Sequence, residues 1–279
     1  MTPAPADKIA RMQASGIITI TTDFGHKGPF AAVMKGVILG RFPAARVVDL
    51  AHDIPAQWPP EAGFWVRYAY RYFPAGTVHV AIVDPGVGTE REILLVDYDG
   101  HAFMAPDNGL LGGLLDAASD ARVYQLNLAS LTGLGITNPS ATFHGRDIFA
   151  PLAAEIAAGR VDVSDVGLLT SDWTPGWLDE PDVGRGRITG VIVTVDTFGN
   201  LISNIDAGLL DGFTAPVANI GGHTIPMLAT YGRAKPGEFL ALINSFGVVE
   251  VAKSEGSAAD GLGLERGAPL VISEHREPQ

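Results

Sequence analysis

The sequence contains no cysteine among its 279 residues. This absence excludes disulfide bonds, zinc sites built from thiolates and a cysteine nucleophile. It also fits a reducing compartment, so we expect the protein to be cytoplasmic.

Long apolar runs and an excess of basic residues are also missing. No stretch reaches the roughly 18 consecutive apolar residues of a membrane-spanning helix, so we expect no membrane span. Residues 1–15, MTPAPADKIARMQAS, lack the apolar core of a signal peptide and predict a loose tail. Lysine and arginine number 19 against 31 aspartates and glutamates, and the formal net charge of -12 argues against a nucleic-acid partner.

What the sequence does contain is enough apolar material for two hydrophobic cores, because 47% of its residues are hydrophobic. Short β-branched runs alternate with segments of helical spacing in the first part of the chain. This order predicts an α/β domain with a mostly parallel sheet over residues 16–165. Residues 166–187 show no period and predict a linker. Nearly every segment within residues 188–279 predicts a strand, which favours a small all-β barrel or sandwich.

The stretch TVHVAIVDPGVGTER, residues 77–91, holds the strongest candidate for chemistry. Its apolar part predicts a buried strand that ends at Asp84, where a Pro-Gly pair breaks it. Open α/β sheets bind ligands beyond the carboxyl ends of their strands, and Asp23 follows the first predicted strand in the same way. Arg91 follows a glycine-rich loop and His144 precedes another predicted helix. An acid, a guanidinium and an imidazole that converge there can hold and polarise one water molecule.

Each of these residues also has an ordinary structural explanation. An aspartate before Pro-Gly can cap its own turn, an arginine after a loop can be solvated, and a histidine before a helix can cap it. A metal site is a further alternative, although no compact metal motif is present. Its ligands would come from Asp23, His26, Asp49, His52, Asp53 and Asp107. The glycines at positions 86 and 88 are a weak nucleotide-binding signal, and a turn explains them better.

A series of motifs extends over roughly residues 17–272. They are TTDFG (21–25), MKGVI (34–38), VDPGVGTER (83–91), PDNGLL (106–111), TFHGRDIFAP (142–151), DTFGNLISNI (196–205) and NSFG (244–247). In this order they resemble the motifs of the S-adenosyl-L-methionine (SAM) hydroxide adenosyltransferase family, which is related to the fluorinase and the chlorinase. The whole series is far more specific than any one of its members.

The resemblance implies a Rossmann-like α/β N-terminal domain and a C-terminal β-barrel domain. It implies a homotrimer with the substrate between the N-terminal domain of one subunit and the C-terminal domain of its neighbour. It also implies that SAM is hydrolysed to adenosine and L-methionine by in-line (SN2) attack of water or hydroxide on the ribose 5′ carbon. No cofactor and no metal are expected.

The resemblance also assigns roles to individual residues, motif by motif. Asp84, Arg91 and His144 resemble the trio that handles the water, and Asp84 is expected to hold the other two and to fix the histidine tautomer. Asp23 resembles the carboxylate that binds the ribose hydroxyls. The remaining implied contacts are Asp196, Asn200 and Ser245 on the methionine side, Tyr231 stacked on adenine, the backbone of Ser254 and Glu255 at the adenine edge, and Glu250 near the amino-acid end.

Two other functions stay open. A halogenase of the same fold would make 5′-chloro-5′-deoxyadenosine, but the halide enzymes carry a tyrosine where this chain has Asp84. An anion site also gains nothing from an added carboxylate. Gly145 leaves room beside the reacting carbon, and it does not separate the two activities. A non-catalytic adenosine or SAM sensor would keep the pocket without turnover.

Overall fold

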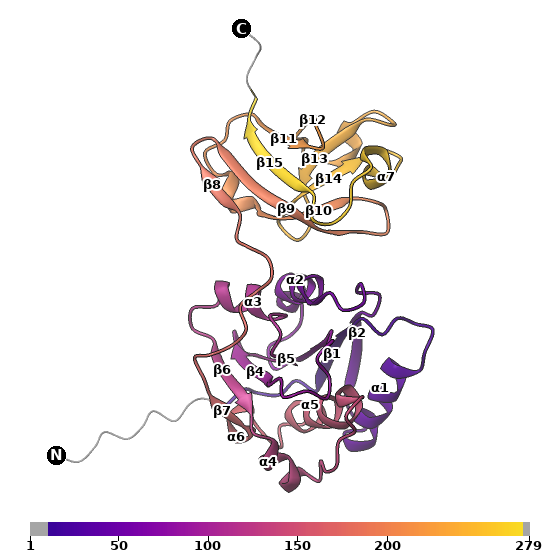
Figure 1. Cartoon of the computed structure of the whole chain (residues 1–279), viewed down its shortest axis with the longest axis vertical. Helices are drawn as coiled ribbons and strands as arrows, with labels where there is room; N and C mark the ends of the chain where they lie inside the picture. Colours follow the sequence, from indigo (N-terminus) through magenta and orange to yellow (C-terminus); the bar gives the residue numbers. More distant parts are fainter. Residues whose placement is uncertain (1–10, 276–279) are drawn as a thin grey trace, which may run out of the picture. The chain divides into compact units, whose positions relative to one another are not determined.

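The computed structural model describes residues 11–275, while residues 1–10 and 276–279 lie outside the described part. The chain divides into two compact units, Met1–Trp177 and Leu178–Gln279, and each is described by itself (Figure 1). The division falls inside the predicted linker, residues 166–187, where two short strands form: β7 (Gly167–Leu169) and β8 (Asp182–Gly184). The domain limits of 16–165 and 188–279 stay a prediction.

The N-terminal unit is built on a mixed sheet of seven strands in the order β2-β1-β3-β5-β4-β6-β7. Besides β7, the strands are β1 (Ile17–Thr22), β2 (Arg46–Ala51), β3 (Val78–Ile82), β4 (Ile93–Tyr98), β5 (His101–Pro106) and β6 (Arg122–Leu126). Pairings from β2 to β5 are parallel, and pairings from β5 to β7 are antiparallel. The predicted mostly parallel sheet is thus corrected to a mixed one. Asp99 and Gly100, with φ of 50° and 75°, form the two-residue turn that folds β5 back on β4.

Helices cover both faces of this sheet (Figure 1). They are α1 (Phe30–Arg41), α2 (Pro59–Ala69), α3 (Gly112–Ala117), α4 (Leu128–Leu131), α5 (Ala150–Ala157) and α6 (Val163–Val166), with 3-10 turns at Tyr70–Tyr72 and Thr132–Leu134 and a π-helical turn at Gly145–Phe149. On β3, Ile82 packs in one core with Met34 of α1, whereas Ala81 packs in the other core with Val66 of α2. Because both faces are buried, all five residues of β3 are buried, and His79 is the one polar residue among them.

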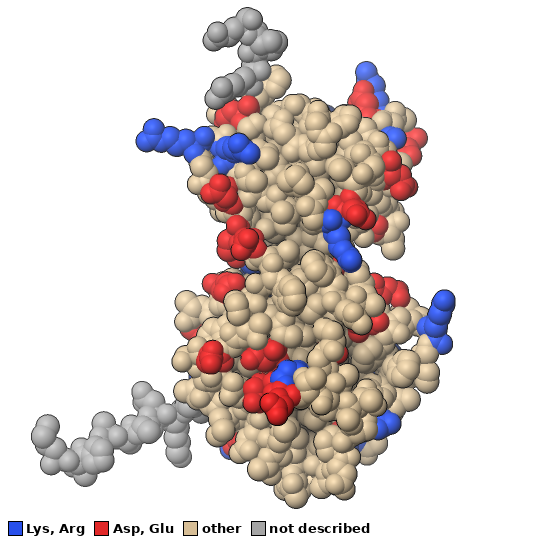
Figure 2. All heavy atoms as spheres, in the orientation of Figure 1, with Lys and Arg blue, Asp and Glu red and all other residues tan. Residues whose placement is uncertain are grey.

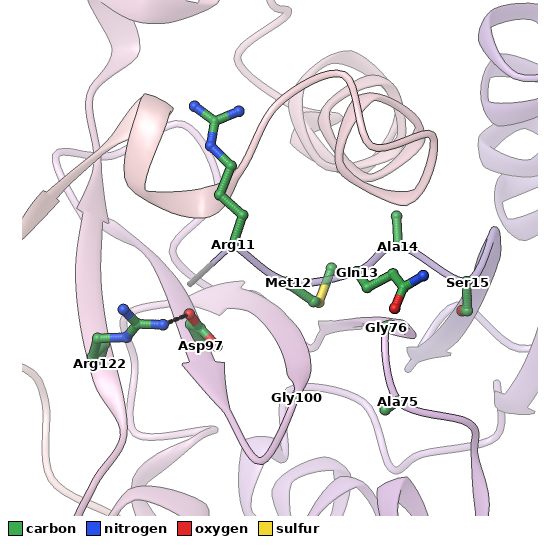
Figure 3. Close-up of a pocket in the computed structure, with 10 residues that line it drawn as sticks. All are labelled: Arg11, Met12, Gln13, Ala14, Ser15, Ala75, Gly76, Asp97, Gly100 and Arg122. Atoms are coloured by element: carbon green, nitrogen blue, oxygen red, sulfur yellow. Dashed lines mark hydrogen bonds and ion pairs between the residues drawn. The ribbon is translucent and has the colours of Figure 1, made fainter. Parts of the chain in front are cut away.

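Residues 11–15 cross one end of this sheet and border a cavity of about 540 Å³ (Figure 3). The Met12 amide donates to Asp162 Oδ2 at 3.3 Å, and the Ser15 amide donates to the Gly76 carbonyl at 3.0 Å. The Met12 side chain packs against the adjacent core. The prediction of a loose tail over residues 1–15 is therefore wrong for residues 11–15, since the sheet end offers acceptors for their amides. Its remaining part, residues 1–10, lies outside the described residues.

The C-terminal unit is an antiparallel sheet of eight strands that nearly closes into a barrel. The order is β12-β11-β15-β9-β10-β14-β13, and β8 pairs with β9 beside this path. The strands are β9 (Arg187–Val195), β10 (Leu201–Asp206), β11 (Pro216–Ile220), β12 (His223–Pro226), β13 (Phe239–Ile243), β14 (Val248–Lys253) and β15 (Pro269–Glu274). The two ends of the path meet, because the Leu228 amide donates to the Ala241 carbonyl at 2.8 Å.

The sequence predicted an all-β unit, but this unit also contains short helical segments. A short helix, α7 (Ala258–Leu262), follows β14, and 3-10 turns lie at Ala207–Leu210 and Tyr231–Arg233. The Ser257 hydroxyl caps α7 by accepting from the Asp260 amide at 3.0 Å, and Gly263 ends it with φ of 65°. The helix is too short to show a hydrophobic period, so its caps define it.

Acidic side chains are visible on the surface of each unit in Figure 2, as the formal net charge of -12 leads one to expect. Basic side chains are fewer and stand among them. Across residues 11–275, none of the helices combines the length and the apolar character needed to cross a membrane.

Candidate active site

Four of the predicted site residues lie in the N-terminal unit, at one end of its parallel strands. Asp23 follows β1, and Asp84 follows β3 after Val83. These two strands are parallel neighbours, so their carboxyl ends open at the same edge of the sheet. The loop after Asp84 returns Arg91 to this edge, and His144 lies directly before the π-helical turn.

The structure brings Asp84, Arg91 and His144 together, with the arginine in the middle. Arg91 Nε lies 3.0 Å from both carboxylate oxygens of Asp84, and Arg91 Nη2 also bonds to Oδ2. The same Nη2 donates to His144 Nδ1 at 2.9 Å. The side chains of Arg91 and Asp84 are 10% and 5% exposed. A buried, bidentate pair of this kind combines strong hydrogen bonds with a fixed geometry.

The order within the trio differs from the expectation that Asp84 would hold the other two and fix the histidine tautomer. Arg91 contacts both partners because its planar guanidinium presents several N–H donors in a rigid fork. Arginine has no acceptor, so Nδ1 of His144 must accept. The neutral imidazole therefore carries its proton on Nε2.

The surroundings of His144 keep the ring neutral. Burial lowers its pKa from the ordinary value of 6.5, and the charge of Arg91 lowers the pKa further. Asp84 and Asp147 oppose this shift with smaller effects. The trio therefore favours the neutral form of its imidazole.

A cavity of about 730 Å³ lies against the trio, within the size range of small-molecule sites. Asp23, Asp84 and His144 line it, and so do three phenylalanines, Phe24, Phe30 and Phe143. The three rings pack edge to face, with centroids 5.6, 5.9 and 6.0 Å apart. The cavity thus joins an apolar aromatic wall to two carboxylates.

Asp23 is fixed in this cavity by a residue that the sequence analysis missed. Its Oδ2 accepts from the backbone amide of Gln57 at 2.9 Å, and Gln57 also lines the cavity. An ionised carboxylate has about four acceptor positions, so most of those of Asp23 stay open to a ligand. The side chain of Gln57 makes no part of this contact, which is why its residue type gave no signal.

His144 sits at the entrance of a π-helical turn, a rare geometry that is frequent at functional sites. The wide turn is closed by the Ala150 amide, which donates to the Gly145 carbonyl. Gly145 is buried, and a Cβ there would lie 3.1 Å from Met34 Sδ and 3.2 Å from a Phe143 ring carbon. The expected room at Gly145 is therefore limited, and a larger residue would push these neighbours.

A further residue of the same loop, Asp147, also escaped the sequence analysis. Hydrogen bonds from Arg146 lower the pKa of Asp147 to about 2. Asp147 Oδ2 accepts from the Ser140 amide at 2.8 Å, and both Ser140 and Arg146 line the cavity. In the sequence, the adjacent residues Arg146 and Asp147 after His144 were the signal that could have predicted this ion pair.

The predicted methionine-side residues Asp196 and Asn200 lie together in the C-terminal unit, in the turn between β9 and β10. Asp196 Oδ1 accepts from the amides of Phe198 and Asn200 at 2.9 and 2.8 Å, and Oδ2 accepts from Asn200 Nδ2 at 3.0 Å. Gly199 completes the turn with φ of 81°. Asp196 thus shapes this turn, and its carboxylate retains acceptor capacity for a cation.

Tyr231 and Glu250 also meet in the C-terminal unit. The Tyr231 hydroxyl donates to Glu250 Oε1 at 2.6 Å, and Asn244 Nδ2 donates to Oε2 at 3.2 Å. Glu250 is only 3% exposed, whereas Tyr231 is 47% exposed. Burial raises the pKa of both side chains, and the nearby charge of Asp196 adds to each shift. Asn244 was missed, although it begins the NSFG motif that was assigned through Ser245.

The last three predicted contacts lie at turns of the same unit. Ser245 is exposed between β13 and β14, and Ser254 and Glu255 follow β14. The Ser254 amide donates to the Glu238 carbonyl at 2.9 Å, and Glu255 adopts a φ of 55°. These residues belong to the C-terminal unit, whereas the trio and Asp23 belong to the N-terminal unit.

The residues considered for a metal site bind other protein groups. His52 bonds to Thr22 Oγ1 at 2.8 Å and to Asp49 Oδ1 at 2.9 Å, and Asp49 also pairs with Lys35 at 2.6 Å. Asp107 accepts from a backbone amide at 2.8 Å. In the part of the chain that the structure describes, no three or more His, Asp or Glu residues are grouped so that they could hold a metal ion.

Comparison with known proteins places most of the chain in one family. The model of the SAM hydroxide adenosyltransferase N-terminal domain matches residues 18–167, and the model of the C-terminal domain matches residues 190–271. The (R)-S-adenosyl-L-methionine hydrolase of Thermus thermophilus is 36% identical over 265 residues, which cover 90% of this chain and 97% of that protein. The protein of the same name from Salinispora tropica is 35% identical and covers 92% of this chain and 97% of its own length.

A more distant sequence relative and a solved structure agree with this family assignment. A fluorinase from an Actinoplanes strain is 26% identical over 94% of this chain and 99% of that protein. The crystal structure of an uncharacterized conserved protein from Thermotoga maritima matches with a TM-score of 0.84 at 30% identity, over 92% of this chain and 100% of that one.

Proposed function

Because the chain belongs to the SAM hydroxide adenosyltransferase family, we propose that it hydrolyses S-adenosyl-L-methionine to adenosine and L-methionine. The observation that carries this proposal is the buried trio of Asp84, Arg91 and His144 against a cavity that Asp23 also lines. Relatives that bear the hydrolase name are 28% to 36% identical to this chain, while the fluorinases are 23% to 26% identical.

The reaction that we propose makes limited demands on the protein. A water oxygen forms a bond to the ribose 5′ carbon, the bond from that carbon to the sulfonium breaks, and its electron pair stays on sulfur. The sulfur leaves as a neutral thioether, so this side needs neither an acid nor a cofactor. Holding the water in line with the breaking bond is the main task, and such positioning is worth up to ~7 to 11 kcal/mol in favourable systems.

The trio suits this task by its charge and its hydrogen bonds. Arg91 stabilises negative charge that develops on the attacking oxygen. His144 Nδ1 already accepts from Arg91, so we assign the departing proton to an open acceptor position of Asp84. From there the proton passes to solvent. The aromatic wall keeps bulk water out, and a dry pocket favours a step in which a cation is neutralised.

The remaining predicted residues are proposed as substrate contacts. Asp23 binds the two ribose hydroxyls, for which an ionised carboxylate has suitable acceptors. Asp196, Asn200 and Ser245 bind the amino-acid part, with Glu250 near it. Tyr231 stacks on adenine, and the backbone of Ser254 and Glu255 bonds to the adenine edge. The hydrogen bond from the Tyr231 hydroxyl to Glu250 holds the Tyr231 ring in one orientation.

We further propose a homotrimer in which each site combines the trio of one subunit with the C-terminal contacts of its neighbour. Mixing two variants at a SAM concentration well below KM tests this arrangement: Asp84→Asn, which lacks the proposed proton acceptor, and Tyr231→Ala, which lacks the proposed adenine stack. If sites are shared, about a quarter of those in randomly mixed oligomers contain two intact parts, and activity returns to that level. If each chain builds its own site, mixing restores nothing. The oligomeric state is measured by light scattering.

The description of the N-terminal unit as Rossmann-like is proposed for its parallel block β2-β1-β3-β5 and the helices that connect it. The description of the C-terminal unit as a β-barrel domain is proposed in the same way. A cytoplasmic location stays a prediction.

The decisive experiment identifies the products after incubation with SAM in ¹⁸O-labelled water. We expect adenosine and methionine in equal amounts, with the label in adenosine, because the ribose carbon is attacked. Label in methionine would contradict this. Tight SAM binding without any product, in wild type and in His144→Ala alike, would favour a sensor. Added chloride separates hydrolase from halogenase, since a dominant 5′-chloro-5′-deoxyadenosine product would overturn the hydrolase assignment.

A further inference from the structure

The PDNG motif, residues 106–109, takes no part in the proposed chemistry, yet it contacts the strand end that carries Asp84. Asn108 Nδ2 donates to the carbonyl of Val83 at 2.8 Å. Val83 is the residue directly before Asp84, so this bond holds the backbone from which the catalytic carboxylate projects. Asn108 Oδ1 accepts from the Leu110 amide at 3.3 Å, which fixes the side chain in this orientation.

The same turn holds the last residues of the N-terminal unit. Trp177 Nε1 donates to the Asn108 carbonyl at 2.6 Å. Asp107 Oδ1 accepts from the Thr174 amide at 2.8 Å, and the Asp107 carbonyl accepts from the Thr174 hydroxyl at 3.3 Å. Segment 174–177 is therefore bonded at both of its ends to two consecutive residues.

Two glycines allow this segment to approach so closely. A Cβ on Gly109 would lie 2.5 Å from the Pro175 carbonyl oxygen, and a Cβ on Gly112 would lie 2.2 Å from the Gly176 nitrogen. Backbone atoms cannot move aside as a flexible side chain can. At the next residue, Gly113, a Cβ would meet only Arg67 Nη1, at 3.6 Å. The demand for glycine is thus specific to the positions that face segment 174–177.

We propose that the PDNG motif couples segment 174–177 to the catalytic strand end, and that Asn108 is a positioning residue that holds Asp84 through Val83. The proposal rests on the proposed function, since the placement of Asp84 matters if the trio acts on water. Trp177 is the last residue of the N-terminal unit, so the point where the chain leaves this unit is fixed to the same strand end. A displacement of about 1 Å in a reacting group can cost on the order of 10²-fold in rate.

The coupling of segment 174–177 to the catalytic strand end is tested by the pair Gly112→Ala and Gly113→Ala. Both substitutions add one methyl group to α3 and raise helix propensity equally, so they differ in the clash with Gly176. We expect Gly112→Ala to be cleaved faster by chymotrypsin after Trp177 and to lose at least about tenfold in kcat. Gly113→Ala is expected to match wild type in its rate of chymotrypsin cleavage and in kcat. Calorimetric SAM stoichiometry gives the number of competent sites, so kcat is expressed per site.

The positioning role is tested by Asn108→Ala against Asn127→Ala. Asn127 caps α4 through a bond from the Ala129 amide at 3.1 Å, so its loss is a matched structural change without a link to Val83. We expect Asn108→Ala to lower kcat about tenfold with KM within about twofold. Its acid limb of kcat/KM should also move to lower pH, because a displaced Asp84 no longer raises the pKa of His144, while Arg91 and Asp147 stay.

The outcomes separate the two proposals. Wild type that releases no adenosine would refute the proposed function and the positioning role with it. An active wild type whose Asn108→Ala variant behaves like Asn127→Ala, in kcat and in pH profile, refutes the positioning role alone. Faster cleavage after Trp177 in Gly112→Ala at unchanged kcat refutes the coupling. If Gly112→Ala does not fold, Trp177→Phe takes its place in both measurements, because it removes the Nε1 donor to the Asn108 carbonyl and keeps an aromatic residue for chymotrypsin.

Discussion

The two units hold their most buried acidic site residues in opposite ways. In the N-terminal unit, the carboxylate of Asp84 is paired with the guanidinium of Arg91. In the C-terminal unit, the bonds to Glu250 come from the neutral groups of Tyr231 and Asn244, and burial raises the pKa of Glu250. The first arrangement keeps a charge available for chemistry. The second holds an acid that is suited to receive a cation from a ligand.

The largest effect that this comparison predicts is that of Asp84→Asn. The change leaves the buried guanidinium of Arg91 without its carboxylate, which typically costs about 3 to 5 kcal/mol in the free energy of unfolding. It also removes the proposed proton acceptor, so we expect kcat to fall about 10²- to 10⁴-fold. Urea unfolding and adenosine release measure the two effects.

Asp165→Asn is the control for this substitution. Asp165 pairs with Arg11, but the two side chains are 34% and 65% exposed, and the bond from the Asp162 amide to Asp165 Oδ2 is one that an asparagine oxygen can also accept. An exposed pair contributes about 0 to 1 kcal/mol, and no activity should be lost. Equal losses of stability in Asp84→Asn and Asp165→Asn would contradict the distinction between a buried and an exposed pair.

The next effect concerns the neutral partners of Glu250. Tyr231→Phe leaves Glu250 Oε1 without its hydroxyl donor, and a buried acceptor without a partner costs about 1 to 3 kcal/mol. The ring is kept, so the Kd for SAM should change little. Tyr231→Leu removes the ring as well and should weaken SAM binding by about tenfold or more. Differential scanning calorimetry measures the loss of stability, and titration calorimetry measures the Kd for SAM. Equal SAM affinity in both variants would disprove the stacking role.

The pH dependence of activity should report the neutral imidazole of the trio. Because the pKa of His144 is lowered from 6.5, kcat/KM is expected to rise with pH through a midpoint below that value, by about tenfold per pH unit on its acid side. In His144→Gln this acid limb should disappear. A midpoint above 6.5 in wild type would mean that the protonated ring is stabilised, against the burial and the charge of Arg91.

The smallest effect is that of Glu250→Gln on stability. The folded protein holds the Glu250 proton more tightly than the unfolded chain, whose glutamates titrate near 4.5. The Glu250 contribution to the free energy of unfolding therefore falls as pH rises above 4.5. Glu250→Gln removes this slope and at pH 7 should be within about 1 kcal/mol of wild type, or more stable. A loss like that of Asp84→Asn would abolish the contrast between the units.

The sequence predicted those parts of the fold and site that depend on local patterns. The apolar run before Asp84, broken by Pro-Gly, identified β3 and its carboxyl end. Asp99-Gly100 is a two-residue hairpin signal in the sequence, and β4 and β5 form that hairpin. The series of strand-like segments in the second half correctly indicated a unit made mainly of strands.

The parts that were missed depend on how distant segments meet. Gln57 contacts Asp23 through its backbone amide, which every residue type except proline provides. The central place of Arg91 follows from the path of its loop, which residue spacing does not define. The antiparallel pairing of β6 and β7 joins two strands that are separated by α4, α5 and α6, so no two-residue turn indicates their relative direction. The helix α7 depends on two capping residues and not on a period.

The π-helical turn at Gly145–Phe149 makes chain length a stricter evolutionary constraint here than residue identity. Each residue turns a helix by about 100°, so a deletion that regularised this turn would rotate His144 by that angle relative to α5. The imidazole would then lose its hydrogen bond with Arg91. Natural variation between His144 and Ala150 should therefore proceed by exchange of side chains, with insertions and deletions confined to the loop before it.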